Sequence, residues 1–318
     1  MQKQTRTQNI LNWYKEFGRE ELPWRKTTDA YPIYLSEIML QQTQVKTVLE
    51  RFYFQFLEKF PTLESLAQAS QDDVLKAWEG LGYYTRARNL HKTAQLVKTA
   101  LPKTAKELEE LPGIGKSTAN AIACFAYNEA NPILDANVKR ILYRFYATKK
   151  ANDKQLWELS HNFFDETQPY EFNQALMDIG STICTPRNAQ CENCPLQTQC
   201  LGKDSPQEYP TKIKKKPVPI KQRKIIVYNY KDKYALFKGE AKLLGGLWAF
   251  RQFETFEQKA IELGEISQTY SHFKLQAQVL LRKCNNNENM QWFTLEEIEN
   301  LALSGADKKV LSLIHKKA

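Results

Sequence analysis

The sequence has no long apolar run, no secretion signal and no internal repeat. No apolar stretch approaches the roughly 18 residues that a membrane-spanning helix needs, and residues 1–12 are too polar for a signal peptide. An extended low-complexity tract is also absent. These absences argue against a membrane, secreted or repeat protein, and we expect a soluble protein of the cytoplasm.

The chain is long and basic. Its 318 residues exceed one ordinary domain and suffice for two. Lys and Arg (45) outnumber Asp and Glu (36), which gives a formal net charge of +9. A polyanion is the natural partner, because each phosphate that a basic side chain neutralises releases a bound counterion. Ribosome-associated and membrane-surface proteins are also basic, so the charge alone does not identify the partner.

A basic segment separates two halves of different character. From Thr7 to about Cys200 apolar residues recur at spacings of three and four, which predicts an all-α region. Residues 212–224 contain seven basic residues, two prolines and no acid, a composition typical of an exposed linker. Beyond this segment the pattern predicts an α+β region. We expect strands at 225–230, 234–238 and 270–281, and helices at 256–263 and 295–303.

A helix, a tight turn and a second helix are predicted in the middle of the helical half. The pattern T-x-x-E at 104–107 is a capping box that opens a short helix ending at Leu111. The turn Pro-Gly-Ile-Gly follows at 112–115, and a second helix is expected over 117–127. Such a turn between helices often has no function of its own.

Four of the six cysteines lie in one short segment with the spacing C-x6-C-x2-C-x5-C. They are Cys184, Cys191, Cys194 and Cys200. Four thiolates this close in sequence can converge on one metal centre, either zinc or an iron-sulfur cluster, and the spacing does not decide between them. The alternative of four unligated core thiols is disfavoured, because the intervening residues are mostly polar.

Two acids stand beside the helical patterns. Asp135 falls at an expected helix start, where an acid is ordinarily an N-cap. Glu37 is expected in the first turn of a helix that opens near Ser36, where an acid is ordinarily a favourable contact with the helix dipole. Neither acid is catalytic by its sequence position alone.

The chain closely resembles the endonuclease III superfamily of DNA glycosylases. The resemblance lies in the order and separation of the hairpin 111–117, the segment 134–140 and the four cysteines. Within that superfamily, the segments 22–25, 35–45 and 80–84 resemble the adenine glycosylases of the MutY type. The match covers nearly the whole chain. It implies a [4Fe-4S] cluster at the four cysteines and double-stranded DNA with adenine opposite 8-oxoguanine or guanine as the substrate.

The resemblance also implies a multi-domain monomer, associated with the nucleoid if the source is a prokaryote. An all-α helix-hairpin-helix glycosylase domain with an iron-sulfur loop is followed by an α+β Nudix-like domain. The limits that we expect are a glycosylase domain at 1–205, a basic linker at 206–222 and a Nudix-like domain at 223–318. Within the first domain, a six-helix barrel is expected at about 29–130, and the iron-sulfur lobe combines the N-terminal helix with about 131–205.

By resemblance, Glu37 is the general acid toward adenine N7, which requires its pKa to be raised in an apolar pocket. Asp135 stays ionised and stabilises the cationic sugar, and Asn137 supports it with hydrogen bonds. This division of labour is the one that paired carboxyl groups perform on glycosides. Gln42 and Tyr83 match the family's intercalating residues, which offset the energy of extruding a base; without the family match, Tyr83 would be read as a packed aromatic residue.

Further residues match the family's binding positions. Leu22, Trp24 and Arg25 correspond to the adenine pocket, although Leu22 and Trp24 suit a core equally well. The phosphate contact, which glycines and a helix N-terminus favour, falls on Gly113, Gly115 and Lys116.

The residue after Lys116 bears on the reaction type. Relatives that also cut the DNA backbone carry a Schiff-base lysine there, whereas this chain has Ser117. The side chain of Lys116 points roughly 100° away from that of Ser117 on a helix. Lys139, which is close to Asp135 in sequence, could at most form an adventitious Schiff base with DNA. We therefore predict a monofunctional glycosylase. The alternatives are a bifunctional endonuclease III-like enzyme for oxidised pyrimidines and a non-catalytic DNA-binding protein with structural zinc.

Residues 225–318 resemble the Nudix-like domain with which adenine glycosylases inspect 8-oxoguanine. Local matches at 244–250, 270–273 and 291–293 carry this resemblance, with Tyr270 where the family more often has Phe. The carboxylates with which a Nudix hydrolase holds Mg²⁺ are missing, so we predict recognition and no nucleotide hydrolysis. Ser271, with His272 beside it, is the candidate contact to 8-oxoguanine.

Overall fold

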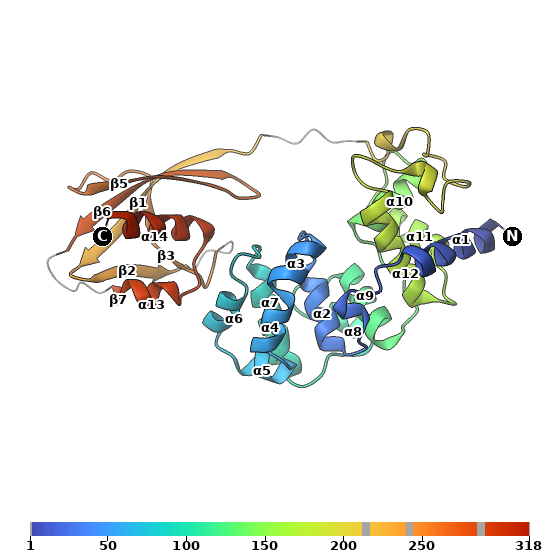
Figure 1. The fold of residues 1–318 in the computed structure, drawn as a ribbon, viewed down its shortest axis with the longest axis horizontal. Coiled ribbons are helices and arrows are strands. Elements are labelled where there is room, and N and C mark those ends of the chain that lie inside the picture. Colours follow the sequence, from blue (N-terminus) through green and yellow to red (C-terminus); the bar gives the residue numbers. More distant parts are fainter. Residues whose placement is uncertain (1, 212–216, 240–243, 285–289, 318) are drawn as a thin grey trace. The chain divides into compact units, whose positions relative to one another are not determined.

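The structure of the protein is a computed structural model that describes residues 2–211, 217–239, 244–284 and 290–317 (Figure 1). Its internal contacts divide the chain into two compact units. The first unit comprises 1–42 and 96–214, and the second comprises 43–95 and 215–318. Part of the helical half therefore groups with the C-terminal region. Residues 212–216 of the expected linker lie outside the described residues.

The first unit is all-α, as predicted. Its elements are α1 Gln2–Phe17, η1 Pro23–Arg25, α2 Ala30–Met39, α8 Ala105–Glu109, α9 Lys116–Tyr127, α10 Ala136–Phe145, α11 Asp153–Phe163, α12 Pro169–Asp178, η2 Ile179–Ile183, η3 Cys191–Asn193 and η4 Pro206–Glu208. One apolar core joins α1 to α10, α11 and α12, and a smaller one packs α2 against α9. In the described part of the chain, no helix is long and apolar enough to cross a membrane.

The predicted helix-hairpin-helix element is confirmed. The Thr104 hydroxyl accepts the backbone N–H of Glu107 and so caps α8, but only half of the predicted capping box forms, because the Glu107 carboxylate accepts from the Thr104 hydroxyl and not from its backbone N–H. Gly113 has a φ of +77°, a left-handed conformation that glycine adopts without strain. Gly115 is the N-cap of α9 and has open space where a Cβ would stand. The turn therefore presents exposed backbone at the start of α9.

The helix that carries Glu37 begins earlier than predicted. Asp29 caps α2 by accepting the backbone N–H of Tyr31, so the helix runs from Ala30 to Met39. Glu37 lies in the last turn of α2. The prediction that it stands in the first turn of a helix opening near Ser36 is therefore wrong. The cap at Asp29 lies outside the apolar pattern from which the start was inferred. Glu37 therefore gains nothing from the positive end of the helix dipole.

The second unit combines helices with a mixed sheet, which confirms the α+β prediction for the C-terminal region. Its helices are α3 Val45–Arg51, α4 Tyr53–Lys59, α5 Leu63–Gln68, α6 Gln71–Ala77, α7 Thr85–Val97, which ends just inside the first unit, α13 Leu295–Glu299 and α14 Gly305–Lys317. Its strands are β1 Ile220–Tyr230, β2 Lys233–Lys238, β3 Trp248–Ala249, β4 Arg251–Phe253, β5 Ile261–Thr269, β6 Lys274–Lys283 and β7 Gln291–Phe293.

The strands follow the order β3-β2-β1-β6-β5, with β4 paired to β1 and β7 to β2. Only β1 and β6 are parallel among these pairs. Along β1 the side chains alternate between two cores, as the strand period requires: Ile225 and Val227 face the core that α14 covers, and Ile226 and Tyr228 face the other. In Figure 1 α14 lies against the sheet.

Two expectations for this region are corrected. The predicted helix at 256–263 is wrong, because Ile261 begins strand β5, which pairs antiparallel with β6. Pairing along the whole of β6 outweighs the local helical spacing. Strand β1 begins at Ile220, inside the expected linker, because its first residues pair with β6 from Lys274 onward. The helix α14 has no counterpart in the sequence prediction.

Candidate active site

Glu37 and Asp135 come together in the first unit, although they are distant in sequence. Both side chains are partly exposed, as groups that must touch a substrate have to be. Burial, followed by the negative charge of Asp135, raises the pKa of Glu37 to about 7, and the positive charge of Arg25 opposes this shift. Glu37 can therefore hold a proton at a pH where an ordinary glutamate is ionised.

Asp135 is held in place by the start of α10. Its carboxylate accepts the backbone N–H of Val138 at 2.7 Å, which confirms the predicted N-cap, and the side-chain amide of Asn137 at 3.1 Å. Burial raises the pKa of Asp135, while these hydrogen bonds oppose the rise. Both bonds favour the ionised form, so the same contacts that cap the helix support an anion here.

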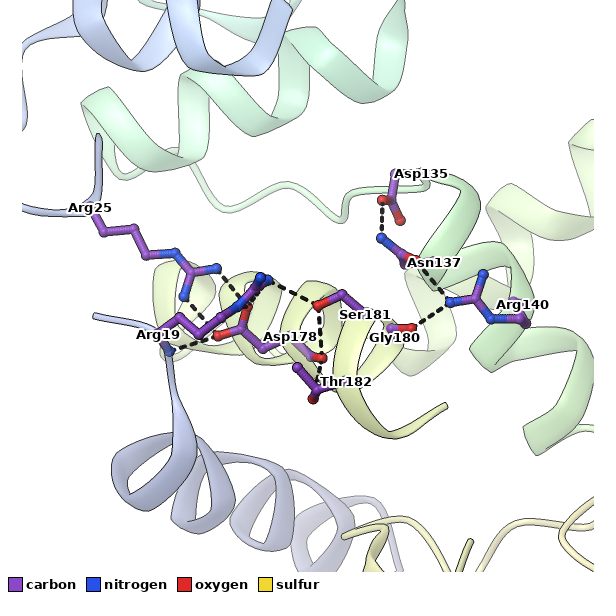
Figure 2. Close-up of polar contacts among 9 residues, drawn as sticks. All are labelled: Arg19, Arg25, Asp135, Asn137, Arg140, Asp178, Gly180, Ser181 and Thr182. Atoms are coloured by element: carbon purple, nitrogen blue, oxygen red, sulfur yellow. Dashed lines mark hydrogen bonds and ion pairs between the residues drawn. The ribbon is translucent and has the colours of Figure 1, made fainter. Parts of the chain in front are cut away.

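Asn137 is fixed from two sides (Figure 2). Its amide nitrogen donates to Asp135, and its oxygen accepts from Arg140 at 2.8 Å. Arg140 also donates to the backbone carbonyls of Gly180 and Cys184. A Cβ at Gly180 would stand 2.5 Å from the Cβ of Asn137, so only glycine permits this approach. The sequence assigned Asn137 but gave no signal for Arg140 or Gly180.

A buried carboxylate, Asp178, binds two arginines (Figure 2). Its side chain is 0% exposed and accepts from Arg25 at 2.7 and 2.8 Å and from Arg19 at 2.6 Å. Burial would raise the pKa of Asp178, but the hydrogen bonds and charges of Arg25 and Arg19 outweigh it, and the pKa is lowered. Sequence reasoning missed Asp178, although an acid between the apolar residues at 175–177 and Ile179 indicates a buried charge with a partner.

Replacing Asp178 with Ala is expected to destabilise the protein by about 3–5 kcal/mol, because two arginines lose their counter-charge and Arg25 stays buried. The lowered pKa means that this stability is present above the unfolded pKa and is lost as the pH falls through the folded value. Thermal unfolding measured between about pH 3 and pH 7, the range in which carboxyl groups titrate, tests both effects.

The control for Asp178 is Asp153→Ala, which removes an exposed ion pair with Lys139. Exposed pairs contribute about 0–1 kcal/mol. An equal loss of stability in the two variants would contradict the role assigned to Asp178.

The lysines near the hairpin have other partners. The Lys116 ammonium lies 4.3 Å from the ring centroid of Trp157, and Lys139 pairs with Asp153 at 2.8 Å. The Ser117 hydroxyl accepts the backbone N–H of Leu134 at 3.1 Å, next to Asp135. Ser117 thus helps to hold the segment that carries the carboxylate, and Lys116 faces elsewhere, as the helical rotation predicted.

The two expected intercalating residues share a backbone feature. Gln42, in the first unit, is exposed and has a φ of +58°, and Tyr83, in the second, is 45% exposed and has a φ of +49°. Such conformations are costly for residues other than glycine and collect at functional sites. Leu22 and Trp24 are buried, consistent with either a pocket wall or a core.

Ser271 and His272 belong to the second unit and are exposed where β5 turns into β6. Tyr270 and Phe273 close this turn through a backbone hydrogen bond of 2.9 Å, and their rings lie 4.8 Å apart. The turn therefore presents the two candidate recognition residues to solvent.

The four cysteines of the spacing motif line one cavity. It is shared with the apolar side chains of Ile141, Phe145 and Leu196. Arg144 donates to the sulfur of Cys184 at 3.3 Å. Among the described residues, no group of three or more Cys, His, Asp and Glu is arranged to hold a metal ion. The four thiols nevertheless line one cavity, and a cluster bound by four cysteines needs its ligands around a common space.

Two family models match the chain. Residues 35–164 match the HhH-GPD superfamily of base excision DNA repair proteins, and residues 225–313 match the NUDIX domain. The chain is 35% identical to the adenine DNA glycosylase of Buchnera aphidicola subsp. Schizaphis graminum, over 96% of this chain and 98% of that protein. The chain belongs to the adenine DNA glycosylase family. The Homo sapiens member is 30% identical over 95% of this chain and 72% of its own length.

Solved structures of other DNA glycosylases resemble the helical half of the present chain. A thermostable thymine-DNA glycosylase is 30% identical, with a TM-score of 0.58 over 63% of this chain and 97% of that chain. Endonuclease III in a non-covalent DNA complex is 17% identical, with a TM-score of 0.55 over 64% of this chain and 95% of that chain. These similarities confirm the predicted endonuclease III-like fold, which a Nudix-like domain follows.

Proposed function

We propose that the protein removes adenine from duplex DNA in which it stands opposite 8-oxoguanine or guanine, by hydrolysing the N-glycosidic bond. The observation that carries this proposal is the pairing of Glu37, whose pKa is raised to about 7, with Asp135, which accepts two hydrogen bonds that favour its ionised form against the effect of burial. A neutral acid and a carboxylate are the two groups that such a hydrolysis requires.

Glu37 gives its proton to N7 of the extruded adenine, so that the base departs as a neutral molecule when the bond between N9 and C1′ breaks. The sugar becomes oxocarbenium-like, and the negative charge of Asp135 stabilises it. A water then adds to C1′ and its proton passes to the Glu37 carboxylate, which restores the acid. Arg140, by fixing Asn137, keeps Asp135 oriented throughout.

Arg25 suits the adenine pocket that the family resemblance assigns to it. Its side chain is buried and its Nε has no hydrogen-bond partner among the described residues, while its terminal nitrogens are held by Asp178. A buried donor without an acceptor is costly, and a base nitrogen of the substrate would supply the acceptor. Its positive charge also keeps the pKa of Glu37 from rising further.

We propose that the exposed elements grip the duplex. Gln42 and Tyr83 insert into the stack beside the extruded base, and the backbone at Gly113 and Gly115 contacts a phosphate. Ser271 and His272 contact 8-oxoguanine on the opposite strand. Cytoplasmic location and a monomeric state stay predictions.

The reaction stops at the abasic site. Ser117 replaces the lysine of the bifunctional relatives, and both nearby lysines are occupied: Lys116 by the Trp157 ring and Lys139 by Asp153. A single-turnover assay on a duplex with adenine opposite 8-oxoguanine tests the proposal. We expect the DNA strand to break only after treatment with alkali. Scission without alkali opposite an oxidised pyrimidine would favour the endonuclease III-like alternative, and binding without excision would favour the non-catalytic one.

We further propose a [4Fe-4S] cluster, held by Cys184, Cys191, Cys194 and Cys200, which cross-links the loop and contributes to folding. Replacing Cys194 with Ser is expected to remove the brown colour and the absorption at about 400 nm that such a cluster gives. Cys284→Ala, outside the cysteine motif, should leave the spectrum unchanged. Colourless protein that contains zinc would contradict the cluster.

A further inference from the structure

Glu79 lies at a junction inside the second unit, between the helical segment 43–95 and the C-terminal region. Its side chain is only 9% exposed. One carboxylate oxygen accepts from the ammonium groups of Lys76 at 3.1 Å and Lys308 at 2.8 Å, and the other accepts the backbone N–H of Leu303 at 3.0 Å. A single carboxylate on the helical side thus binds two elements of the C-terminal region.

Lys76 completes this junction. Besides Glu79, its ammonium donates to the backbone carbonyls of Glu299 at 2.6 Å and Leu301 at 3.1 Å. An ammonium has three N–H donors, so each of them has an acceptor here. We call Lys76, Glu79, Leu303 and Lys308 the Glu79 joint. The joint holds the segment 299–303 from its helical side by charged hydrogen bonds, which are about twice as strong as neutral ones.

The joint adjoins the Tyr83 turn. Tyr84, the residue after Tyr83, donates its hydroxyl to the backbone carbonyl of Leu303 at 3.3 Å. The residue after Leu303 is Ser304, which donates its hydroxyl to the side chain of Asp307 at 2.5 Å and also acts on Tyr270, where it opposes the rise in pKa that burial causes. Tyr270 opens the turn that carries Ser271 and His272. A short run of contacts therefore links the expected intercalating residue to the expected 8-oxoguanine contact.

A second contact supports the same junction. Arg88 of α7 donates to the backbone carbonyl of Gly245 at 2.7 Å, and Lys238 pairs with Asp72 at 2.7 Å. Gly246 has a φ of +82°, and a Cβ there would meet the Leu75 side chain at 2.9 Å and the Gln71 side chain at 2.4 Å. Gly246, which lies in a segment that was singled out only by family resemblance, thus permits close approach to α6.

We propose that Glu79 is a positioning residue for damage recognition. Through the Glu79 joint it fixes the position of the Ser271 turn relative to the Tyr83 turn. The preference for adenine opposite 8-oxoguanine over adenine opposite guanine depends on this relative position. This inference rests on the proposed function. Glu79 touches no substrate and acts on selectivity through Leu303 and Lys308. Removing it weakens the link between the two turns, although the contacts of Tyr84 and Arg88 remain, and leaves the residues around Glu37 intact.

The experiment compares single-turnover excision of adenine opposite 8-oxoguanine and opposite guanine in the full-length protein. Glu79→Ala is expected to lower the ratio of the two rates by about tenfold, equivalent to about 1.4 kcal/mol. The rate of excision opposite guanine should stay within about twofold of the wild-type rate, because the residues that cleave the adenine bond are unchanged. Gly246→Ala, which disturbs the junction from the C-terminal side, should lower the ratio in the same direction.

The matched control is Glu50→Ala, which removes an acid from an exposed pair with Lys46 in the same unit and should leave the ratio unchanged. An unchanged ratio in folded Glu79→Ala, or an equal fall of both rates together with the melting temperature, would overturn the proposal. If Glu79→Ala fails to fold, Gly246→Ala and Lys308→Ala decide in the same way. Wild-type protein that removes no adenine from either duplex would instead overturn the proposed function.

Discussion

Replacing Glu37 with Gln is expected to slow adenine excision by roughly 10²–10⁴-fold, the range that a general acid contributes, while DNA binding is retained. Gln has nearly the shape of protonated Glu but cannot give a proton to N7. The measurement is single-turnover excision from a duplex with adenine opposite 8-oxoguanine, beside a binding titration with the same duplex.

The control for this substitution is Glu158→Gln, which removes the same charge from an exposed position on α11 of the same unit and should leave the rate unchanged. The pH profile gives a second readout. The active form of Glu37 is protonated, so the rate should fall as the pH rises through its pKa of about 7. Unchanged excision by Glu37→Gln, or a flat profile above that pH, would refute the assigned acid.

Replacing Asp135 with Asn is expected to lower the excision rate by about 10²–10³-fold, as loss of one electrostatic stabiliser does, with little effect on folding. Asn caps a helix about as well as Asp, so the bond to the Val138 backbone is kept while the charge is lost. Since the pKa of Asp135 is raised by burial, the wild-type rate should also decline as the pH falls through that pKa.

Asp29→Asn is the matched control, because Asp29 caps α2 in the same way. Its rate should stay within about twofold of wild type, and its melting temperature should match that of Asp135→Asn, since both caps are preserved. Equal rates for the two variants would mean that the charge of Asp135 has no part in the chemistry.

Short-range features were predicted well from the sequence. The Thr104 cap, the turn at Gly113 and the Asp135 cap each depend on residues at most a few positions apart. The strands predicted at 225–230 and 234–238 are likewise confirmed as parts of β1 and β2. Where local spacing competed with sheet pairing, at 256–263, the prediction failed because β5 is stabilised by its partner β6 rather than by its own sequence.

The residues of the candidate site likewise include some that the sequence predicted and some that it did not. Glu37, Asp135 and Asn137 were assigned by family resemblance, and the influence of the Arg25 charge on Glu37 was not predicted. The buried carboxylate that orients Arg25 lies 153 positions away, at Asp178, and no motif marks it. Gly180 is required only because Asn137 approaches it, which is a property of the packed helices.

By itself the sequence determined the caps at Thr104 and Asp135, the helix-hairpin-helix turn, the cysteine spacing and the family, since each depends on residue types at short separations or in fixed order. Only the tertiary structure decided which groups meet. The raised pKa of Glu37 needs the burial and the charge that folding brings to it, and Lys76 reaches Glu299 across 223 positions. Burial and charge act through space, and their partners are known only once the chain has packed.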